Sequence, residues 1–350
     1  MLELIRSGRA AELVNSGAIL RTAFCGPCFG AGDVPGNSGL SIRHSTRNFP
    51  NREGSKPGEG QISAVALMDS RSIAATAANG GVLTPATEIE INYTEPDYHF
   101  DGSVYSKRVY NGYKKPHPDE KLVYGPNIAD WPEFYECPEA MLLNVAALLT
   151  DSVTTTDELI PSGETSSYRS NPEKLSSFAL SRKDPSYVKT AKDIRDKEKN
   201  RRNGIDTGLE GLFSKLSGIT GRSPDEIMVG TLVAAVKPGD GSAREQAASC
   251  QRVLGGLANI AKEYATKRYR SNLINWGMLP FVTKDFDKLS KSDWIFIDDV
   301  RKTLLSGGSS FKGKIIGENG VTDIDLDIGK ITDDERMIIL KGCLINYNKR

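Results

Sequence analysis

Two unbroken apolar runs constrain the fold of this chain most. Residues 142–149 (LLNVAALL) and 227–235 (IMVGTLVAA) have the length of strands and contain few polar residues, which indicates strands buried in a core. The second run leads into a glycine-rich turn at 238–242 and then into a predicted helix over 243–254. Because further helices and strands alternate after it, we expect an α/β domain of mixed strands.

The remaining elements of this half follow from local patterns. Asn319-Gly320 suits a type I′ turn and predicts a hairpin over 311–328. The highly charged stretch at 189–202 is typical of a solvated helix. Helices are also predicted at 264–275 and 332–343, and strands at 279–282 and 294–297.

The first half of the chain has a different residue composition and hydrophobic pattern. Apolar spacing predicts helices over 1–20 and 62–80. Between them, residues 24–60 are rich in glycine and proline, which is typical of a long functional loop. Residues 92–140 carry many tyrosines and prolines without a helical period, which indicates a linker.

Composition excludes several classes of function. Lys+Arg and Asp+Glu each number 45, so the formal net charge is zero and no global basic field exists for nucleic acid. No run approaches the roughly 18 apolar residues of a membrane helix, and the first residues lack the pattern of a signal peptide. We therefore expect a soluble, cytoplasmic protein with no membrane partner.

The five cysteines are unevenly placed, and Cys25 and Cys28 form a CxxC pair. Two thiolates on one tight turn can bind a metal, contribute to an iron–sulfur cluster, or form a redox pair. Glycine and proline around the pair disfavour the helix of a redox motif, and a second CxxC for zinc is absent. A share in a cluster fits best, although it requires a further ligand, and two ordinary buried cysteines are the alternative.

Arginines gather downstream of the CxxC pair. Arg47 and Arg52 lie in one loop with Phe49 between them. Guanidinium forks pair bidentately with carboxylates, so these residues are candidates for binding an acidic ligand. The alternative is a set of surface salt bridges, which are common and weak.

Three further candidates lie in the second half. Ser242 sits where a strand, a glycine turn and a helix start meet, with Arg244 in the first turn, and this arrangement is a natural anion site. A plain serine N-cap is the alternative. Asp157 and Arg169 lie in predicted loops, where such residues usually form a structural salt bridge.

Together and in this order, these segments resemble the aconitase family of iron–sulfur hydro-lyases. The sequence of residues 25–81 most resembles a bacterial hydratase branch of that family. The matching segments are CGPC at 25–28, RNFPNR at 47–52, TTD at 155–157 with Arg169 after it, GSARE at 241–245, and NLINWGMLP at 272–280.

The resemblance implies a role for each candidate. Cys25 and Cys28 would ligate a [4Fe–4S] cluster whose third cysteine ligand is not in this chain. Ser242 would be the catalytic base, and Asp157 would also be catalytic. The substrate would be a small hydroxy-di- or tricarboxylic acid. Its carboxylates would be bound by Arg47, Arg52, Arg169 and Arg244.

Two departures from the family pattern concern the substrate. Ala243 stands where the family has a second serine, so one hydrogen bond to a substrate carboxylate is lost. Thr46 stands where an asparagine usually precedes the first arginine of the RNF motif, which alters a contact to the cluster. These changes predict a substrate other than citrate, or weak activity.

The resemblance also implies a domain organisation. Residues 1–95 would be the C-terminal part of the third α/β domain, 96–140 a linker, and 141–350 the complete swivelling β/β/α domain. The missing N-terminal domains would be supplied in cis or in trans. Two alternatives are a cluster-free module that binds RNA or a protein partner, and a separately encoded subunit of the kind found in isopropylmalate isomerases.

Overall fold

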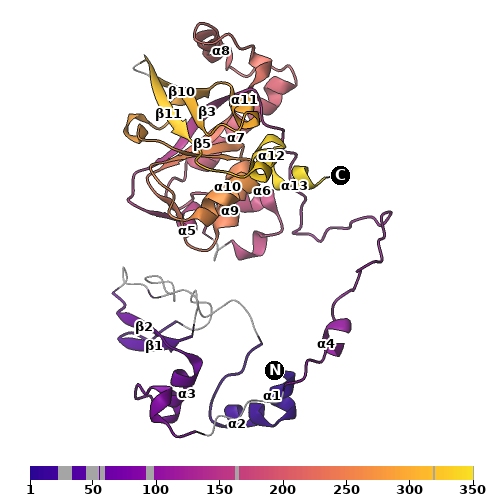
Figure 1. Cartoon of the computed structure of the whole chain (residues 1–350), viewed down its shortest axis with the longest axis vertical. Helices are drawn as coiled ribbons and strands as arrows, with labels where there is room; N and C mark the ends of the chain where they lie inside the picture. Colours follow the sequence, from indigo (N-terminus) through magenta and orange to yellow (C-terminus); the bar gives the residue numbers. More distant parts are fainter. Residues whose placement is uncertain are drawn as a thin grey trace. The chain divides into compact units, whose positions relative to one another are not determined.

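The computed structural model describes residues 1–22, 34–44, 55, 60–91, 98–161, 165–317 and 320–349 (Figure 1). The chain divides into two compact units, Met1–Asp119 and Glu120–Arg350. The division falls inside the segment that the sequence predicts to be a linker. Each unit is described by itself below.

The first unit is built from short elements. They are α1 (Leu2–Arg6), α2 (Arg9–Asn15), β1 (Gly39–Arg43), β2 (Ser63–Leu67), α3 (Ser70–Ala78), η3 (Ala86–Glu88) and α4 (Ser103–Ser106). The helix predicted over 1–20 is two helices, because Gly8 takes a φ of +77° between them.

The helix predicted over 62–80 is wrong in its first part. Residues Ser63–Leu67 form β2, which pairs with β1 in parallel, and the helix starts only at Ser70. Asp69 marks this change because its carboxylate accepts the backbone N–H groups of Arg71 and Ser72, both at 3.0 Å. This N-cap fixes the start of α3.

The second unit is a closed barrel in the strand order β10-β11-β8-β7-β5-β3-β9. The strands β3, β5, β7 and β8 run parallel to one another, and the other pairings are antiparallel. The bounds are β3 (Ala140–Leu149), β5 (Ile227–Ala235), β7 (Gly256–Ala261), β8 (Leu279–Val282), β9 (Trp294–Ile297), β10 (Ser310–Gly317) and β11 (Gly320–Asp327). The α/β class and the predicted strands of this half are confirmed, whereas β7 was not predicted.

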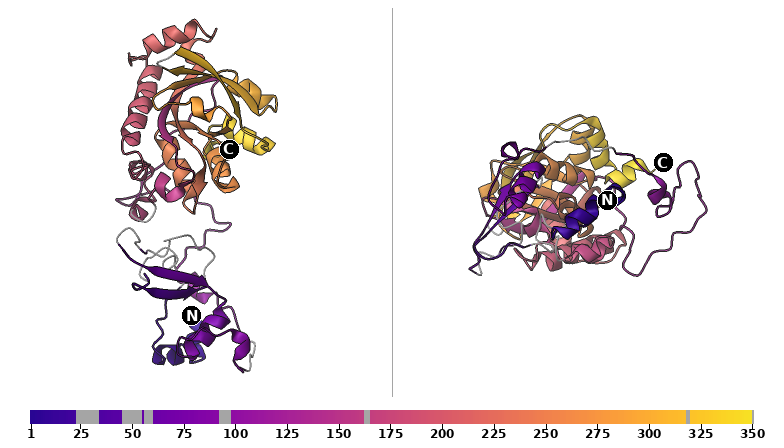
Figure 2. Two further views of the ribbon diagram at one scale, coloured as in Figure 1. Left: turned by 90° about the vertical axis from the view of Figure 1, so that its left-hand side faces the viewer. Right: turned by 90° about the horizontal axis from the view of Figure 1, so that it is seen from below.

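Helices cover the outside of the barrel (Figure 2). They are α5 (Thr156–Leu159), α6 (Pro172–Ser176), α7 (Tyr187–Arg202), α8 (Glu210–Ser217), α9 (Arg244–Val253), α10 (Lys267–Asn275), α11 (Val300–Leu305), α12 (Asp333–Leu340) and α13 (Leu344–Asn348). The described part of this unit also contains three short 3₁₀ turns, η4 (Ser166–Tyr168), η5 (Pro224–Glu226) and η6 (Phe286–Lys288). It is completed by a small parallel pair of strands, β4 (Thr154–Thr155) and β6 (Pro238–Asp240).

The unbroken apolar runs are explained by burial on both faces of the sheet. Leu232 and Ala234 of β5 lie in the barrel core, whereas the alternate residues Val233 and Ala235 belong to a second core under the outer helices. Because successive side chains of a strand point to opposite faces, a strand with a core on each side needs apolar residues throughout. The sheet is therefore the middle layer between two cores.

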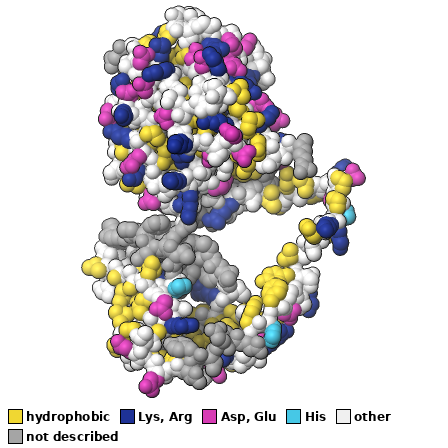
Figure 3. Space-filling view, in the orientation of Figure 1, with side chains coloured by type: hydrophobic (Ala, Val, Ile, Leu, Met, Phe, Trp, Pro, Cys, Tyr) yellow, Lys and Arg dark blue, Asp and Glu magenta, His cyan; other side chains and the backbone are white. Residues whose placement is uncertain are grey.

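The charged helix α7 is confirmed, but only part of its surface is solvated. Tyr187, Ala191, Ile194 and Glu198 are buried and recur at a spacing of three or four residues. This spacing places them on one helix face, which packs on β5. On the visible face of the second unit, acidic and basic side chains are interspersed (Figure 3), in keeping with the balanced charge.

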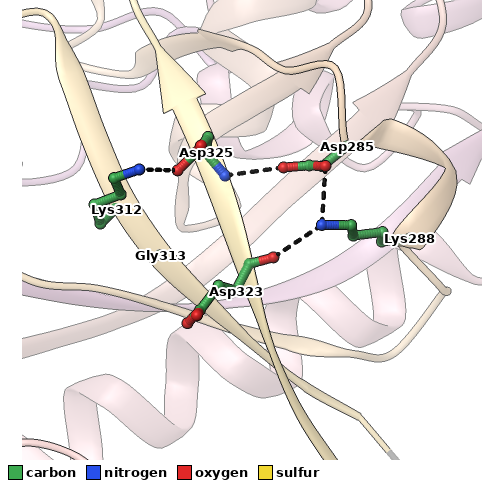
Figure 4. A pocket seen from close by; sticks show the side chains of 6 residues that line it. All are labelled: Asp285, Lys288, Lys312, Gly313, Asp323 and Asp325. Carbon is green, nitrogen blue, oxygen red and sulfur yellow. Dashed lines mark hydrogen bonds and ion pairs between the residues drawn. The ribbon is translucent and has the colours of Figure 1, made fainter.

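The barrel closes between β8 and β11, where the backbone ladder contains a single residue pair. Side chains after β8 continue this closure: the Thr283 hydroxyl donates to the Asp325 carbonyl at 2.6 Å, and the Asp285 carboxylate accepts the Asp325 N–H at 3.2 Å. Lys288 donates to the Asp323 carbonyl at 3.2 Å. A pocket of about 450 Å³ lies over this seam, and its lysines and aspartates bond to one another and to the β11 backbone (Figure 4). These contacts protect a strand edge that would otherwise be open.

Candidate functional site

The loop that carries Ser242 connects β6 to α9. Ser242 is exposed, and the two glycines before it, Gly239 and Gly241, have φ angles of +97° and +119°. A Cβ on Gly241 would lie 2.4 Å from the Thr156 hydroxyl oxygen, and one on Gly239 would lie 2.4 Å from the Tyr269 ring. Both the backbone conformation and the available space therefore require glycine at these two positions.

The pairing of β4 with β6 brings a second segment beside the Ser242 loop. Thr154 is in register with Pro238 and Thr155 with Asp240, and α5 starts immediately afterwards. Asp157 lies in the first turn of α5. The two motifs that the sequence places far apart therefore meet at one edge of the small sheet.

The start of α9 adds positive charge to this edge. Ala243 occupies the N-cap position, where a methyl group cannot cap, and Arg244 begins the helix. The half-buried Arg244 guanidinium donates a hydrogen bond back to the Gly241 carbonyl. A helix N-terminus and a guanidinium both stabilise negative charge, so this edge is suited to an anion.

Asp157 forms an ion pair with Arg182, with 2.8 Å between Oδ2 and Nη1. Both side chains are about half exposed, so the pair contributes little to stability. The salt bridge expected of a lone aspartate is present, with Arg182 as a partner. The proposed catalytic role of Asp157 remains a prediction.

A second charged group fixes the segment around Asp157. Lys183 bonds to Glu158 at 2.9 Å and to Asp151 at 3.1 Å, and these hydrogen bonds raise the Lys183 pKa. Burial opposes ionisation of Glu158, but hydrogen bonds from Thr155 and Lys183 outweigh it and hold the Glu158 pKa below its ordinary value. Glu158 thus fixes the start of α5 through two contacts. Its carboxylate pairs with Lys183, and it forms a capping box with Thr155.

Arg169 lies at the end of η4, where it is exposed. The next residues lead into α6, whose N-cap Asn171 accepts the Lys174 N–H at 3.1 Å. Helix α6 packs against α9, the helix that starts beside Ser242. The structure thus connects Arg169 to the Ser242 loop through two packed helices.

Four predicted site residues lie outside the described residues. They are Cys25, Cys28, Arg47 and Arg52. Their roles as cluster ligands and as carboxylate-binding residues remain predictions from the sequence.

The described residues do not fit an iron–sulfur cluster. Within the described ranges, no group of three or more His, Cys, Asp or Glu side chains could hold a metal ion. Cys137, Cys250 and Cys343 are buried. Burial raises the Cys137 pKa to about 12 and also raises the Cys250 pKa, so both thiols are neutral near pH 7. Any cluster would need ligands from elsewhere.

The sequence places Thr156 in the TTD segment but indicates neither its contact with Ala243 nor the role of Arg182. Thr156 accepts the Ala243 N–H across a sequence separation of 87 residues, and Arg182 pairs with Asp157 across 25 residues. Neither contact has a local signal, because each depends on the β4–β6 pairing or on the packing after α6.

Among the described residues, no helix is long and apolar enough to cross a membrane.

Known proteins resemble the chain in both halves. A sequence model of the aconitase family (aconitate hydratase) matches residues 2–77, and a model of the aconitase C-terminal domain matches residues 228–285. The mitochondrial homoaconitase of Cryptococcus neoformans is 24% identical over 332 residues, which are 93% of this chain and 40% of that protein.

Two archaeal proteins match shorter stretches. The methanogen homoaconitase small subunit of Methanocaldococcus jannaschii is 30% identical over 136 residues, 39% of this chain and 71% of that subunit. A probable 3-isopropylmalate dehydratase large subunit of Methanosarcina mazei is 37% identical over 87 residues, 24% of this chain and 19% of that one. Almost the whole of this chain matches the Cryptococcus homoaconitase, but the match spans less than half of that protein's length.

Proposed function

Because the chain belongs to the aconitase family, we propose that it is the C-terminal part of a hydro-lyase that dehydrates and rehydrates a hydroxy-di- or tricarboxylic acid. In this proposal, residues 1–95 belong to the third domain, 96–140 link the domains, and 141–350 form the swivelling domain. One observation carries the proposal: β4–β6 pairing brings the Asp157 segment beside the Ser242–Arg244 loop.

Ser242 is the proposed base. Dehydration next to a carboxylate requires removal of a proton from carbon, and in this proposal that proton moves to the Ser242 Oγ atom. A serine alkoxide forms only where positive charge and N–H groups stabilise it. The start of α9 and the Arg244 guanidinium, fixed to the Gly241 carbonyl, supply such an environment next to Ser242.

Arg244 and Arg169, with Arg47 and Arg52 from the first unit, are the proposed carboxylate-binding residues. Guanidinium groups hold carboxylates in a fixed orientation and so keep the reacting carbon near the base. Ala243 offers no hydroxyl at the position where the family has a second serine. The proposal therefore favours a substrate that makes one polar contact fewer than citrate.

A [4Fe–4S] cluster is part of the proposal, with Cys25 and Cys28 as two of its ligands. When bound, such a cluster supplies an open iron site that acts as a Lewis acid on the substrate hydroxyl. The third ligand would come from the upstream domains, because the three cysteines of the second unit are buried and belong to no metal-binding group of the described residues.

The upstream domains are the proposed partner. The match to homoaconitase along 93% of this chain favours a connection in cis. The second candidate is a subunit that needs a separate upstream chain, and the match to 71% of a small subunit favours it. An RNA-binding module is less favoured, since Glu198 pairs with both Arg201 and Arg202 on the basic helix α7.

The experiment is a hydratase assay on the chain combined with an upstream polypeptide that carries the third cysteine, after anaerobic reconstitution with iron and sulfide. The probes are aconitate, homoaconitate and 3-isopropylmalate. The reunited protein should turn over one of them, and Ser242→Ala should lower kcat by about 100-fold or more, the scale of acid–base catalysis. Ser306→Ala, a change at another exposed serine, is the control. Stable cluster absorbance and activity from this chain alone would contradict the proposal.

A further inference from the structure

The Ser242–Ala243 peptide is held by a residue from another motif. The Ala243 N–H donates to the Thr156 hydroxyl oxygen at 3.2 Å. Thr156 is 1% exposed and immediately precedes Asp157. A single buried hydroxyl therefore joins the two segments that the proposed function requires to work together.

This hydrogen bond acts on the orientation of Ser242. The N–H of Ala243 belongs to the same planar peptide unit as the Ser242 carbonyl, so fixing its direction fixes the backbone rotation that follows the Ser242 Cα. Gly241, on the other side of Ser242, has a φ of +119° and lies against the same Thr156 hydroxyl, as the 2.4 Å approach of a hypothetical Cβ shows. Thr156 thus restrains the loop on both sides of the serine.

Besides the Arg244 bond to the Gly241 carbonyl, two contacts hold the loop upstream of Gly241. Thr266 donates its hydroxyl to the Gly239 carbonyl at 3.1 Å, and the Ala265 N–H donates to the Pro238 carbonyl at 3.0 Å. These bonds fix β6, upstream of Gly241. Ala243 has no polar side chain that could cap α9, and the Thr156 hydroxyl accepts the N–H of this N-cap residue itself.

We infer that Thr156 is a positioning residue for Ser242 and acts through the Ala243 amide. The inference rests on the proposed function only for the consequence in catalysis; the restraint on the loop stands on the geometry alone. Thr156 touches neither the reacting atoms nor the substrate in this account. It sets the direction from which Ser242 meets them.

A matched pair of variants tests the restraint. Thr156→Val keeps the shape of the side chain but removes the acceptor, and Thr156→Ser keeps the acceptor. Thr154→Val is the control, because Thr154 is also buried in this segment and its hydroxyl has no hydrogen-bond partner in the described part of the chain.

The first measurement is amide hydrogen exchange of Ala243 in the full 350-residue chain labelled with ¹⁵N-alanine. One hydrogen bond corresponds to a change of roughly two- to tenfold, so exchange should accelerate by about this factor in Thr156→Val. Thr156→Ser and Thr154→Val should retain the protection of the parent chain. Unchanged Ala243 exchange in Thr156→Val, or equal acceleration in Thr154→Val, would overturn the inference.

The second measurement uses the hydratase reunited with its upstream part. Thr156→Val should lower kcat by about tenfold with KM nearly unchanged, and Thr156→Ser should restore it. Loss of kcat in Thr156→Val without rescue by serine would overturn the positioning role. The proposed function fails separately, if Ser242→Ala retains full activity while Ala243 exchange still responds to Thr156.

Discussion

Replacing Gly241 by alanine should destabilise the second unit by more than backbone strain alone. At a φ of +119°, any L-residue is strained, which costs about 1–3 kcal/mol. The new Cβ would also lie 2.4 Å from the Thr156 hydroxyl oxygen, so Thr156 must move and release the Ala243 N–H. Crowding of this kind costs about 1–3 kcal/mol, and the lost hydrogen bond about 0.5–1.5 kcal/mol.

Gly320→Ala is the matched control. Gly320 has a φ of +117°, almost the same as Gly241, but no described atom lies within 4 Å of its hypothetical Cβ. Both variants therefore carry similar backbone strain, and only Gly241→Ala carries the contact with Thr156. We expect Gly241→Ala to be the less stable variant by about 1.5–4.5 kcal/mol, the sum of the crowding and hydrogen-bond terms.

The assay is urea unfolding followed by tryptophan fluorescence. All three tryptophans, Trp131, Trp276 and Trp294, lie in the second unit, so this signal follows that unit and is not mixed with unfolding of the first. The difference between the two variants in free energy of unfolding gives the contribution of the contact. Equal destabilisation of the two variants would refute the close approach of Gly241 to Thr156.

Three further predictions concern the second unit. Thr283→Val removes the hydroxyl that donates to the Asp325 carbonyl and should destabilise the barrel by about 1 kcal/mol in urea unfolding, whereas no change would contradict its part in closing the seam. The buried Cys137 thiol, whose pKa is raised to about 12, should resist iodoacetamide at pH 8 until urea unfolds the chain; mass spectrometry that finds it labelled in the native chain would contradict its burial. Because folding lowers the Glu158 pKa from its ordinary value of 4.5, the stabilisation by this carboxylate is complete above that value and is lost as pH falls through the lowered pKa. The stability gap between the parent chain and Glu158→Gln should therefore narrow from neutral pH to about pH 3, and a gap that widens would contradict this sign.

The sequence was most informative where burial decides the pattern. The strands β3 and β5 could be predicted because each lies between two cores, which requires apolar residues at successive positions. Strand β7 (GLANIA) was missed since its glycine and asparagine interrupt such a pattern. The run at 62–80 has the pattern of one helix because alanine is frequent throughout it, although its first part pairs with β1 and Asp69 starts a new element.

The candidate site could be predicted only in its separate pieces. The order of strand, glycine turn and helix start makes Ser242 and Arg244 candidates from local sequence alone. The neighbour that holds this loop, Thr156, could not be found in the same way, because the contact spans 87 residues and depends on two very short paired strands. Arg182 was missed for a similar reason, since the ion pair with Asp157 is set by tertiary packing and not by a motif.

The most direct test of the account is the kcat of the reunited, reconstituted hydratase before and after Ser242→Ala. The account predicts turnover of a hydroxy-di- or tricarboxylic acid by the parent protein and a fall in kcat of about 100-fold or more in the variant, with Ser306→Ala unchanged. Full activity of Ser242→Ala under the same conditions would contradict the central claim that the loop between β6 and α9 supplies the base.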